Sequence, residues 1–512
     1  MTIRNDVPVV AAIASLTGND LLRFLSRQRW FAGKGAALSD ARVASTIVLP
    51  WSDGRFAVTR VVVTTDDAEV AYQVPLAARD SVPDGVPDRS MLGPADDRGA
   101  TRVYDAVHDA EFRDGLSRAL AAGVVAREGD SEWIAEPLAT GWLPAAESVA
   151  TTVSPAEQSN TSIVIGDRAI LKLFRTLKPG VHPDVELTRF LTTRATFFNT
   201  PRLLGTIQFD DAGTRTTAGM LQEFLPGSSD AWSHALERGR TYFAAPAGRD
   251  APNTFVGDAH RLGAVTRAMH DALASDDDDI AFAPEAIMPE DLERWAQRTQ
   301  QAIRESLLLL ERRIPSPDFP RTRVAEAQAL VRRRDHYAGW VDEIVDTLGE
   351  AVSEGARIRI HGDYHLGQVL RTPGGDFMII DFEGEPSKSL EERREKTSPL
   401  RDVAGMLRSI AYAAATLATS VEKTIDAPTR ELRAARWERD VREAFLGGYL
   451  GEPEHPEDMP ELFPEDDRQM RRLLALFETE KAFYELAYEL NNRPSWVWIP
   501  MRGIAKLFVA LT

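Results

Sequence analysis

Hydrophobic and polar residues alternate along much of the first half of the chain. In residues 45–77, apolar and polar residues alternate in segments that are separated by the turn sequences SDG and DDA. In residues 162–177 they alternate on both sides of a Gly-Asp pair. Residues 202–227 repeat the pattern and end in an apolar stretch. A period of two is typical of half-buried strands, and a Gly-containing break predicts a hairpin. The first half is therefore expected to be rich in strands.

The second half has apolar positions spaced three and four residues apart, as in amphipathic helices. Shorter helices are expected within the first half, one of them capped by Thr17 or Asn19 and ending at Gly33, another with Pro183 near its start. The expected helices cover 17–33, 101–123, 182–194, 256–274, 288–314 and 324–352.

This order of elements predicts three parts. Residues 1–130 form an N-terminal cap, residues 131–227 a small β-rich lobe, and residues 228–512 an α-helical lobe with a short strand–loop–strand insert. A small β lobe followed by a large helical lobe favours an α+β bilobal fold of the protein-kinase-like type. The 512-residue length allows two or three domains.

Composition narrows the function. The net charge of −18 argues against nucleic acid as a partner, because phosphate backbones require a basic surface. The chain has no cysteine, which excludes disulfides and thiolate metal sites and favours a cytoplasmic location. No run of 18 apolar residues occurs, so no membrane span is expected, and the N-terminal apolar patch is too short for a signal peptide.

Two acidic motifs carry the candidate chemistry. Asp363 follows the apolar alternation of IRIHGD, and Asp381 and Glu383 end the apolar stretch FMIIDFE eighteen residues later. Two strands joined by the turn RTPGG would bring Asp363, Gln368 and Asp381 together. In phosphoryl transfer one carboxylate orients or deprotonates the accepting hydroxyl, and others hold Mg²⁺ against the nucleotide phosphates. The side-chain oxygen of Gln368 would complete the metal shell without adding charge.

These motifs resemble the catalytic and metal segments of the aminoglycoside phosphotransferase-like kinases, although Gln368 stands where the usual pattern has Asn. The whole chain is similar to the actinobacterial maltokinase family in five segments. They are QRWFAGKG, QSNTSIVIGDRAILKLFR, HGDYHLGQVLRT, IIDFEGEPSKSLEERREKTSPLRDVAGMLRSIAYAA and EKAFYELAYELNNRPSWVWIP. The resemblance implies an ATP- and Mg²⁺-dependent sugar kinase that phosphorylates the anomeric hydroxyl of maltose to give maltose 1-phosphate.

The nucleotide-binding residues are expected in the β-rich lobe. Lys172 follows a Gly-Asp turn on a predicted strand and matches the lysine that binds nucleotide phosphates, with Glu186 as its helix partner. The sequence QSNTS lies where such kinases place a phosphate-covering loop, and QEFLPG resembles the hinge between the lobes. Either segment could instead be a turn or connection with no role in nucleotide binding. The candidate residues in them are Ser159, Asn160, Thr161, Ser162, Gln222 and Phe224.

The sugar-binding residues are expected in the helical lobe. Lys481, Tyr484 and Glu485 share a face of the C-terminal helix and match the maltokinase C-terminal segment, although such a stripe is usually core plus solvated charge. His365 follows Asp363 by two residues and could contact the acceptor hydroxyl or the loop backbone. We expect Arg401 and Asp402 to form structural contacts beneath the site.

Three functional alternatives remain at this point. A related branch of actinobacterial kinases phosphorylates glucosamine, so a glucosamine or other hexosamine kinase is one alternative, and many carboxylates near the C-terminal helix would suit an amine. A pseudokinase that binds nucleotide and regulates a trehalose- or glycogen-metabolising enzyme is disfavoured, because the aspartates and the lysine are all present. Phosphorylation of maltose, which the family resemblance implies, is the preferred hypothesis, with possible association with those enzymes.

Overall fold

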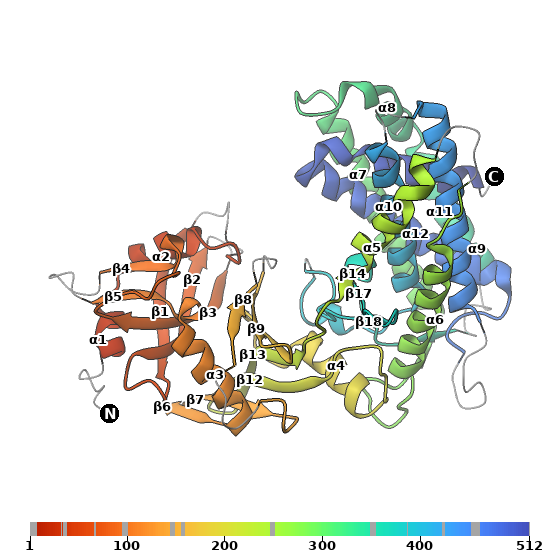
Figure 1. Ribbon diagram of the computed structural model, residues 1–512. Coiled ribbons are helices and arrows are strands. Elements are labelled where there is room, and N and C mark those ends of the chain that lie inside the picture. The colour runs from red at the N-terminus through yellow and green to blue at the C-terminus, as the bar shows by residue number, and fades with distance from the viewer. Residues whose placement is uncertain are drawn as a thin grey trace. The chain divides into compact units, whose positions relative to one another are not determined.

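The computed structural model forms two compact units (Figure 1). It describes residues 8–31, 33, 38–65, 68–94, 101–143, 149–154, 159–245, 251–348, 355–386, 388–421, 425–451 and 461–510. The first unit comprises residues 1–189 and 201–226, and the second comprises residues 190–200 and 227–512. The expected division into a cap, a β-rich lobe and a helical lobe stays a prediction.

The first unit begins with an antiparallel sheet of strand order β1-β2-β3-β5-β4. The turn before β2 contains Asp53 and Gly54, whose positive φ angles of 46° and 78° reverse the chain as the sequence SDG predicted. Buried apolar side chains of the two N-terminal helices pack on this sheet. The elements are α1 (Pro8–Ala14), α2 (Gly18–Ser26), β1 (Leu38–Val48), β2 (Phe56–Thr65), β3 (Glu69–Arg79), β4 (Met91–Pro94) and β5 (Arg102–Asp105).

A second antiparallel sheet in the same unit has the strand order β6-β7-β12-β13-β10-β9-β8. The predicted hairpin about Gly166 is confirmed as β9 and β10, with a φ of 57° at the glycine. The elements are α3 (Ala110–Ala122), β6 (Val125–Glu128), β7 (Ser131–Pro137), β8 (Thr151–Val153), β9 (Thr161–Ile165), β10 (Ala169–Leu173), β11 (Thr176–Leu177), α4 (Pro183–Thr193), β12 (Leu203–Asp211) and β13 (Thr214–Glu223).

The two sheets of the first unit are joined through β11, which pairs with β3. Arg175, just before β11, is buried and donates to the buried carboxylate of Asp105 at 2.7 Å and to the hydroxyl of Thr161 at 2.8 Å. The Gln73 amide donates to the backbone oxygen of Ala218 at 2.8 Å. These polar contacts hold the N-terminal sheet against the second one.

The second unit is mainly helical (Figure 1). Helices α6 and α11 approach so closely that a Cβ on Gly263 would lie 2.0 Å from the Phe445 backbone oxygen, and one on Gly448 would lie 1.9 Å from that of His260. The helices are α5 (Ala231–Ala244), α6 (Val256–Leu273), α7 (Pro289–Arg313), α8 (Val324–Arg332), α9 (Arg334–Leu348), α10 (Leu400–Ser420), α11 (Ala427–Tyr449), α12 (Asp467–Asn492) and α13 (Trp498–Ala510).

Short strands and 3₁₀ turns complete the described elements. The strands are β14 (Ser229–Asp230), β15 (Glu285–Ala286), β16 (Ala356–Arg357), β17 (Val369–Arg371) and β18 (Phe377–Ile379). The 3₁₀ turns are η1 (Asp88–Ser90), η2 (Ala106–His108), η3 (Arg321–Arg323), η5 (Leu366–Gln368), η6 (Glu392–Arg394) and η8 (Pro494–Trp496).

The structure corrects several expected boundaries. Thr17 caps α2 as predicted, but the helix ends at Ser26 rather than Gly33. The expected helix 101–123 starts as a strand, and α3 begins only after Asp109, whose side chain accepts from the Glu111 amide. The expected helix 324–352 is divided at Arg333 into α8 and α9.

The expected strand ending at Gly362 is also wrong. β16 stops at Arg357, and the backbone N–H groups of His361 and Gly362 donate to the Asp402 carboxylate instead of a neighbouring strand. The hairpin around the PGG turn is formed by β17 and β18.

No single helix within the described ranges is long and apolar enough to span a membrane. The pair α1 and α2, bent by 96°, meets the length and composition criteria only when the two helices are combined.

We predict that Arg175→Met destabilises the first unit strongly. The replacement leaves the Asp105 carboxylate buried without its cation, and breaking a buried ion pair costs about 3–5 kcal/mol. Urea unfolding followed by tryptophan fluorescence measures the loss. Arg168→Met removes an arginine that is half exposed and lies 3.8 Å from the exposed Asp167, so it should change stability by less than about 1 kcal/mol. Equal losses in both variants would contradict the proposed link.

Candidate active site

The Asp363 loop of the second unit is held by the start of α10. The Asp402 carboxylate accepts the backbone N–H groups of His361 at 2.8 Å and Gly362 at 2.9 Å. Gly362 has a φ of 84°, which favours glycine and turns the chain just before Asp363. Gly405 lies one helical turn after Asp402, where a Cβ would stand 2.6 Å from the Tyr364 backbone oxygen. The loop therefore rests directly on the α10 backbone.

Asp402 is buried and remains a carboxylate. Burial raises the pKa of a carboxyl group, but here the hydrogen bond and charge of His270, together with the Gly362 N–H, outweigh it and lower the pKa of Asp402. The His270 Nε2 atom lies 3.2 Å from Asp402, and its Nδ1 atom lies 3.0 Å from the Tyr449 hydroxyl. The expected structural role of Asp402 beneath the site is confirmed.

Asp363 faces the ammonium group of Lys481. The Lys481 Nζ lies 3.5 Å from a carboxylate oxygen of Asp363 and 4.8 Å from the centre of the Tyr484 ring. Burial favours the neutral amine, but the carboxylates of Asp363, Glu385 and Glu485 outweigh it and raise the pKa of Lys481 above its ordinary value. Lys481 is therefore a cation, and the structure brings three of the predicted residues together.

A cavity of about 280 Å³ opens beside this pair. Asp363, Lys481 and Tyr484 line it, so an acceptor in this cavity would contact the candidate base. The charged side chains around it are Arg298, Asp363, Glu385, Lys388, Glu392, Arg393, Glu395, Arg401, Asp402, Glu480 and Lys481.

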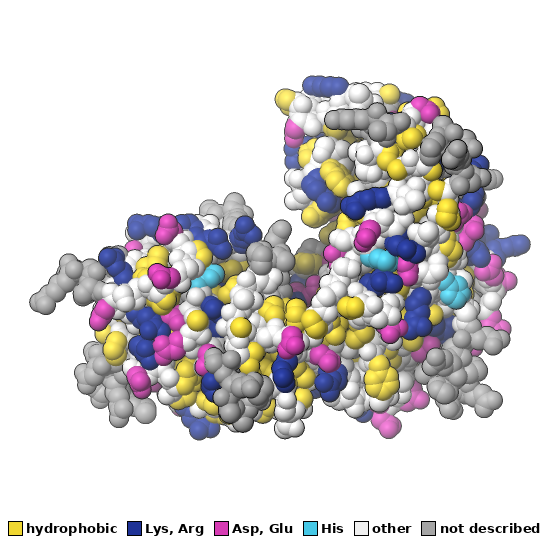
Figure 2. Space-filling view, in the orientation of Figure 1, with side chains coloured by type: hydrophobic (Ala, Val, Ile, Leu, Met, Phe, Trp, Pro, Cys, Tyr) yellow, Lys and Arg dark blue, Asp and Glu magenta, His cyan; other side chains and the backbone are white. Residues whose placement is uncertain are grey.

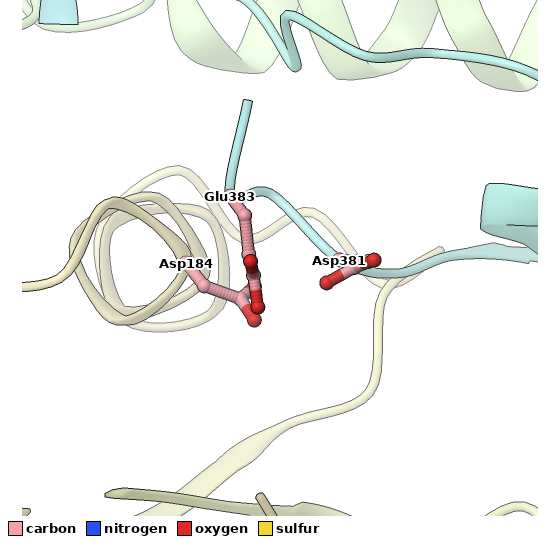
Figure 3. A group of neighbouring side chains, drawn as sticks. All are labelled: Asp184, Asp381 and Glu383. Atoms are coloured by element: carbon pink, nitrogen blue, oxygen red, sulfur yellow. The ribbon is translucent and has the colours of Figure 1, made fainter. Parts of the chain in front are cut away.

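The second acidic motif follows β18. The Gln368 amide N–H donates to an Asp381 carboxylate oxygen at 2.9 Å, which leaves the Gln368 side-chain oxygen as an acceptor. One carboxylate oxygen of Asp381 lies within 4.8 Å of one of Glu383, and both side chains come from the same segment (Figure 3). Carboxylate and amide oxygens are suitable ligands for Mg²⁺. These three residues could therefore hold a divalent cation.

His365 is turned toward its own loop. Its Nδ1 atom accepts the Gly367 N–H at 3.0 Å and caps η5. Burial lowers the pKa of His365 against the opposing charge of Asp363, so the imidazole is neutral near pH 7. A contact between His365 and the acceptor stays a prediction.

Glu485 was expected to bind the sugar, but its carboxylate is paired with an arginine. Arg408 donates to one Glu485 oxygen at 2.9 and 2.7 Å, and Glu485 is absent from the described lining of the cavity. Arg401 similarly holds Glu480 in a two-point ion pair at 2.8 and 2.9 Å. The sequence contained no sign of the Arg408–Glu485 pair, because the two residues are 77 positions apart.

In the first unit, Lys172 projects from β10 and lies 3.2 Å from the Asp184 carboxylate. Asp184, drawn on α4 in Figure 3, is fully buried and stands two residues before the Glu186 that the sequence suggested as partner. Sequence reasoning missed Asp184, although both acids lie in the predicted first turn of the helix. The pairing of Lys172 with Glu186 stays a prediction.

The expected phosphate-covering residues have different environments. Thr161 and Ser162 are buried in β9, and the Thr161 hydroxyl accepts from Arg175. Ser159 is exposed and accepts from the Asn160 amide at 3.4 Å. Their contacts with phosphate stay predictions.

The expected hinge residues end the first unit. The Phe224 N–H donates to the Arg168 backbone oxygen at 2.9 Å, so this amide is already satisfied. Gln222 is buried, and its amide nitrogen has no hydrogen-bond partner within the described part of the chain. A role for both residues in adenine binding stays a prediction.

Comparisons with known proteins agree with this arrangement. Residues 24–109 match the maltokinase N-terminal cap domain, and residues 151–385 match the phosphotransferase enzyme family. The glucosamine kinase of Streptacidiphilus jiangxiensis is 25% identical over 69% of this chain and 72% of its own length. The glucosamine kinase of Mycolicibacterium smegmatis is 26% identical over 69% of this chain and 78% of its own length.

Solved structures show the same fold. A glucosamine kinase in complex with glucosamine, ADP and inorganic phosphate has a TM-score of 0.65 and 21% identity, and covers 97% of this chain and 98% of that one. A second crystal form of glucosamine kinase gives a TM-score of 0.64 at 22% identity over 94% and 97% of the two chains. The predicted α+β bilobal kinase-like fold with an N-terminal cap is confirmed. Residues 151–385 thus match the phosphotransferase enzyme family, residues 24–109 match the maltokinase N-terminal cap domain, and the chain is similar to glucosamine kinases.

Proposed function

We propose that this kinase transfers the γ-phosphate of ATP to the anomeric hydroxyl of maltose and forms maltose 1-phosphate. The observation that carries this proposal is the Lys481 ammonium, 3.5 Å from Asp363 in the acceptor cavity. The maltokinase cap domain supports the same sugar. Use of ATP is supported by the family and by the ADP found in a related glucosamine kinase structure.

In the proposed reaction Asp363 accepts the proton of the sugar hydroxyl. The hydroxyl oxygen forms a bond to the γ-phosphorus, the bond from that phosphorus to the β–γ bridging oxygen breaks, and ADP leaves with the electron pair. Most of the rate enhancement then comes from positioning and charge neutralisation rather than from covalent chemistry. The Asp402 contacts of the loop support this role, because they fix the backbone before Asp363.

The proposal assigns two groups of residues to the nucleotide. Gln368, Asp381 and Glu383 would hold Mg²⁺, which neutralises phosphate charge when bound. Lys172 would contribute a further positive charge toward the phosphates. The Lys172 ammonium lies 3.2 Å from the buried Asp184 carboxylate, which gives it an acidic partner.

The charge balance of the cavity favours a neutral sugar. The cavity carboxylates already have partners: Glu480 pairs with Arg401, Glu395 with Arg298, and Glu385 with Lys388. Glu392 accepts the Ser389 N–H and Asp402 is held by the loop. A substrate ammonium would therefore compete with existing cations for most of these carboxylates, and within the described residues that line the cavity only one buried carboxylate oxygen, that of Glu385, lacks a hydrogen-bond partner.

Lys481 adds a direct penalty for an amine. Two positive charges about 4 Å apart repel by about 4 kcal/mol at an effective dielectric constant near 20. A neutral hydroxyl, by contrast, can accept a hydrogen bond from the Lys481 ammonium. The Tyr484 ring beside it offers an apolar face to a pyranose ring. Both residues therefore suit a neutral disaccharide.

Glucosamine is the second candidate substrate. The two curated relatives, each aligned over 69% of this chain, are named glucosamine kinases. A substrate panel of maltose, glucosamine, glucose and an aminoglycoside, with products identified by ³¹P NMR, separates the candidates. Glucosamine phosphate as the main product would overturn the assignment to maltose.

Asp363→Asn is expected to lower kcat by at least about 10²-fold, because the amide cannot accept the hydroxyl proton. Steady-state kinetics should show a nearly unchanged KM for ATP, and the melting temperature should stay within about 2 °C. Asp376→Asn, which removes an exposed aspartate paired with Arg261, is the matched control and should keep full activity. Near-normal turnover by the Asp363 variant would reject its role as base.

Asp381→Ala is expected to abolish turnover by removing a carboxylate ligand of Mg²⁺ and the partner of Gln368. Binding of Mn²⁺ in the presence of ADP, followed by electron paramagnetic resonance, should weaken by about tenfold or more. The same Asp376→Asn control should bind Mn²⁺ as the parent does. Undiminished Mn²⁺ binding would remove Asp381 from the metal site, whatever its effect on turnover.

Lys481→Gln is expected to change sugar preference. Loss of the ammonium removes a hydrogen bond to a charged group and should lower kcat/KM for maltose by about tenfold or more. The same change removes repulsion toward an amine, so the ratio of kcat/KM for glucosamine to that for maltose should rise.

Arg471→Gln is the control for this variant, since it removes one exposed positive charge from the same helix. It should leave the ratio unchanged. If the Lys481 variant also keeps the parental ratio, the ammonium does not select the substrate.

A further inference from the structure

The helical unit contains a second and larger cavity. Its volume is about 640 Å³, against about 280 Å³ beside Asp363, and the two cavities share no lining residue among those described. It lies among α8, α9, the end of α10, the start of α11, and α13. Small-molecule sites commonly have volumes of about 300–1,000 Å³. The cavity is therefore large enough for a ligand that the proposed reaction does not use there.

Positive charge dominates its lining. The four arginines are Arg323, Arg333, Arg430 and Arg502, and the two acids are Glu326 and Glu431. Arg323 pairs with Glu326 at 2.9 Å. Within the described residues, no carboxylate lies within 4 Å of the Arg333 or Arg502 guanidinium. Figure 2 shows several Lys and Arg side chains on the surface of this unit. A guanidinium stays charged throughout the physiological pH range.

Tyr337 adds a neutral donor to the cavity. It is only 1% exposed, lines the cavity, and packs against Phe483 and Phe508 at ring distances of 5.5 and 4.6 Å. Burial raises the pKa of Tyr337 to about 12, against the opposing charge of Arg333, so the hydroxyl keeps its proton. Among the described residues its hydroxyl has no hydrogen-bond partner, and it is not one of the fully buried unpaired polar atoms, so a ligand in the cavity could accept a hydrogen bond from it.

The lining also offers surface for a ring. The Trp498 indole lines the cavity with Arg323 over it at 5.5 Å, and Leu330 and Met501 add apolar wall. Guanidinium groups bind phosphate oxygens through paired hydrogen bonds, and several of them suit a doubly charged group better than a single carboxylate. Indole and aliphatic surface suits a sugar or base ring attached to that group.

We propose that this cavity is a second binding site for an organic phosphate monoester, with Arg333 and Arg502 binding the phosphate and Trp498 contacting the ring. A sugar phosphate and a nucleoside monophosphate share this chemistry. The site needs no assumption about which sugar the active site phosphorylates.

Two helices connect this site physically to the acceptor cavity. Arg401 and Asp402 of α10 line the acceptor cavity, and Thr419 of the same helix lines the second one, about 25 Å along the axis at 1.5 Å per residue. Tyr337 packs on Phe483 of α12, which lies two residues after Lys481. A ligand that orders Tyr337 therefore acts on the helix that carries a substrate-binding residue.

The test is isothermal titration calorimetry of the full chain with maltose 1-phosphate, AMP, inorganic phosphate and maltose. The double variant Arg333→Gln/Arg502→Gln is compared with Arg332→Gln/Arg436→Gln, which removes two exposed helix arginines outside the cavity. At least one of the two esters should bind the parent and the control variant with the same affinity. The same ester should bind the cavity variant about tenfold or more weakly, or with one site fewer per chain. Both variants should keep the parental kcat.

The two ester arms identify the ligand. Binding of maltose 1-phosphate alone marks a sugar phosphate site, and binding of AMP alone marks a nucleotide site. The proposal fails if both esters bind the cavity variant as they bind the parent, if neither binds, or if only inorganic phosphate binds. Failure to phosphorylate maltose would overturn the proposed function without changing these titrations, so the two outcomes are distinguishable.

Discussion

The buried carboxylate of Asp402 is the constraint on which the candidate active site depends. It accepts the backbone N–H groups of His361 and Gly362 and lies 3.2 Å from the His270 Nε2 atom. Without it, two backbone donors would be left unsatisfied in a dry environment, at about 1–3 kcal/mol each. The chain just before Asp363 would then lose its fixed path. One carboxylate therefore joins the Asp363 loop to α10 and, through His270, to α6.

Helix α12 is fixed by the same kind of interaction. Three of its glutamates form ion pairs with arginines of other helices. Glu478 pairs with Arg442 of α11, and Glu480 and Glu485 pair with Arg401 and Arg408 of α10. Buried ion pairs contribute little net stability, but removing one partner is costly, so they restrict how the helix can rotate or shift. Lys481 lies between these fixed positions. Its distance from Asp363 is consequently set by the packing of α10 and α11 against α12.

Local patterns in the sequence predicted the features that depend on neighbouring residues. The β9–β10 hairpin follows from alternation about Gly166, and the α2 cap follows from Thr17 and Asp20, whose side chains satisfy each other's backbone N–H groups. The grouping of Asp363 with Lys481 could be predicted only through the family resemblance, because 118 positions separate them.

Other features depended on distant contacts. The apolar alternation of IRIHGD indicated a strand, but among the described residues pairing beyond Arg357 is limited to an isolated bridge between Ile358 and Thr397, and Asp402 accepts the amides of His361 and Gly362. The first turn of α4 offered two acids, Asp184 and Glu186, and spacing alone could not show that Asp184 lies beside Lys172. In each case tertiary contacts decided between alternatives that were locally equivalent.

Asp381 shows how the fold itself orders the residues that we propose as metal ligands. Its φ of 70° is a left-handed conformation, which costs a non-glycine residue about 1–2 kcal/mol and is best tolerated by Asn and Asp. The Gln368 amide N–H donates to one carboxylate oxygen of Asp381 and so orders that carboxylate beside the Gln368 side-chain oxygen. Glutamine in place of the usual asparagine thus keeps a neutral oxygen while ordering the neighbouring carboxylate. A cation that binds there needs little further ordering of side chains, and the strain at Asp381 is balanced by the contacts of the folded loop.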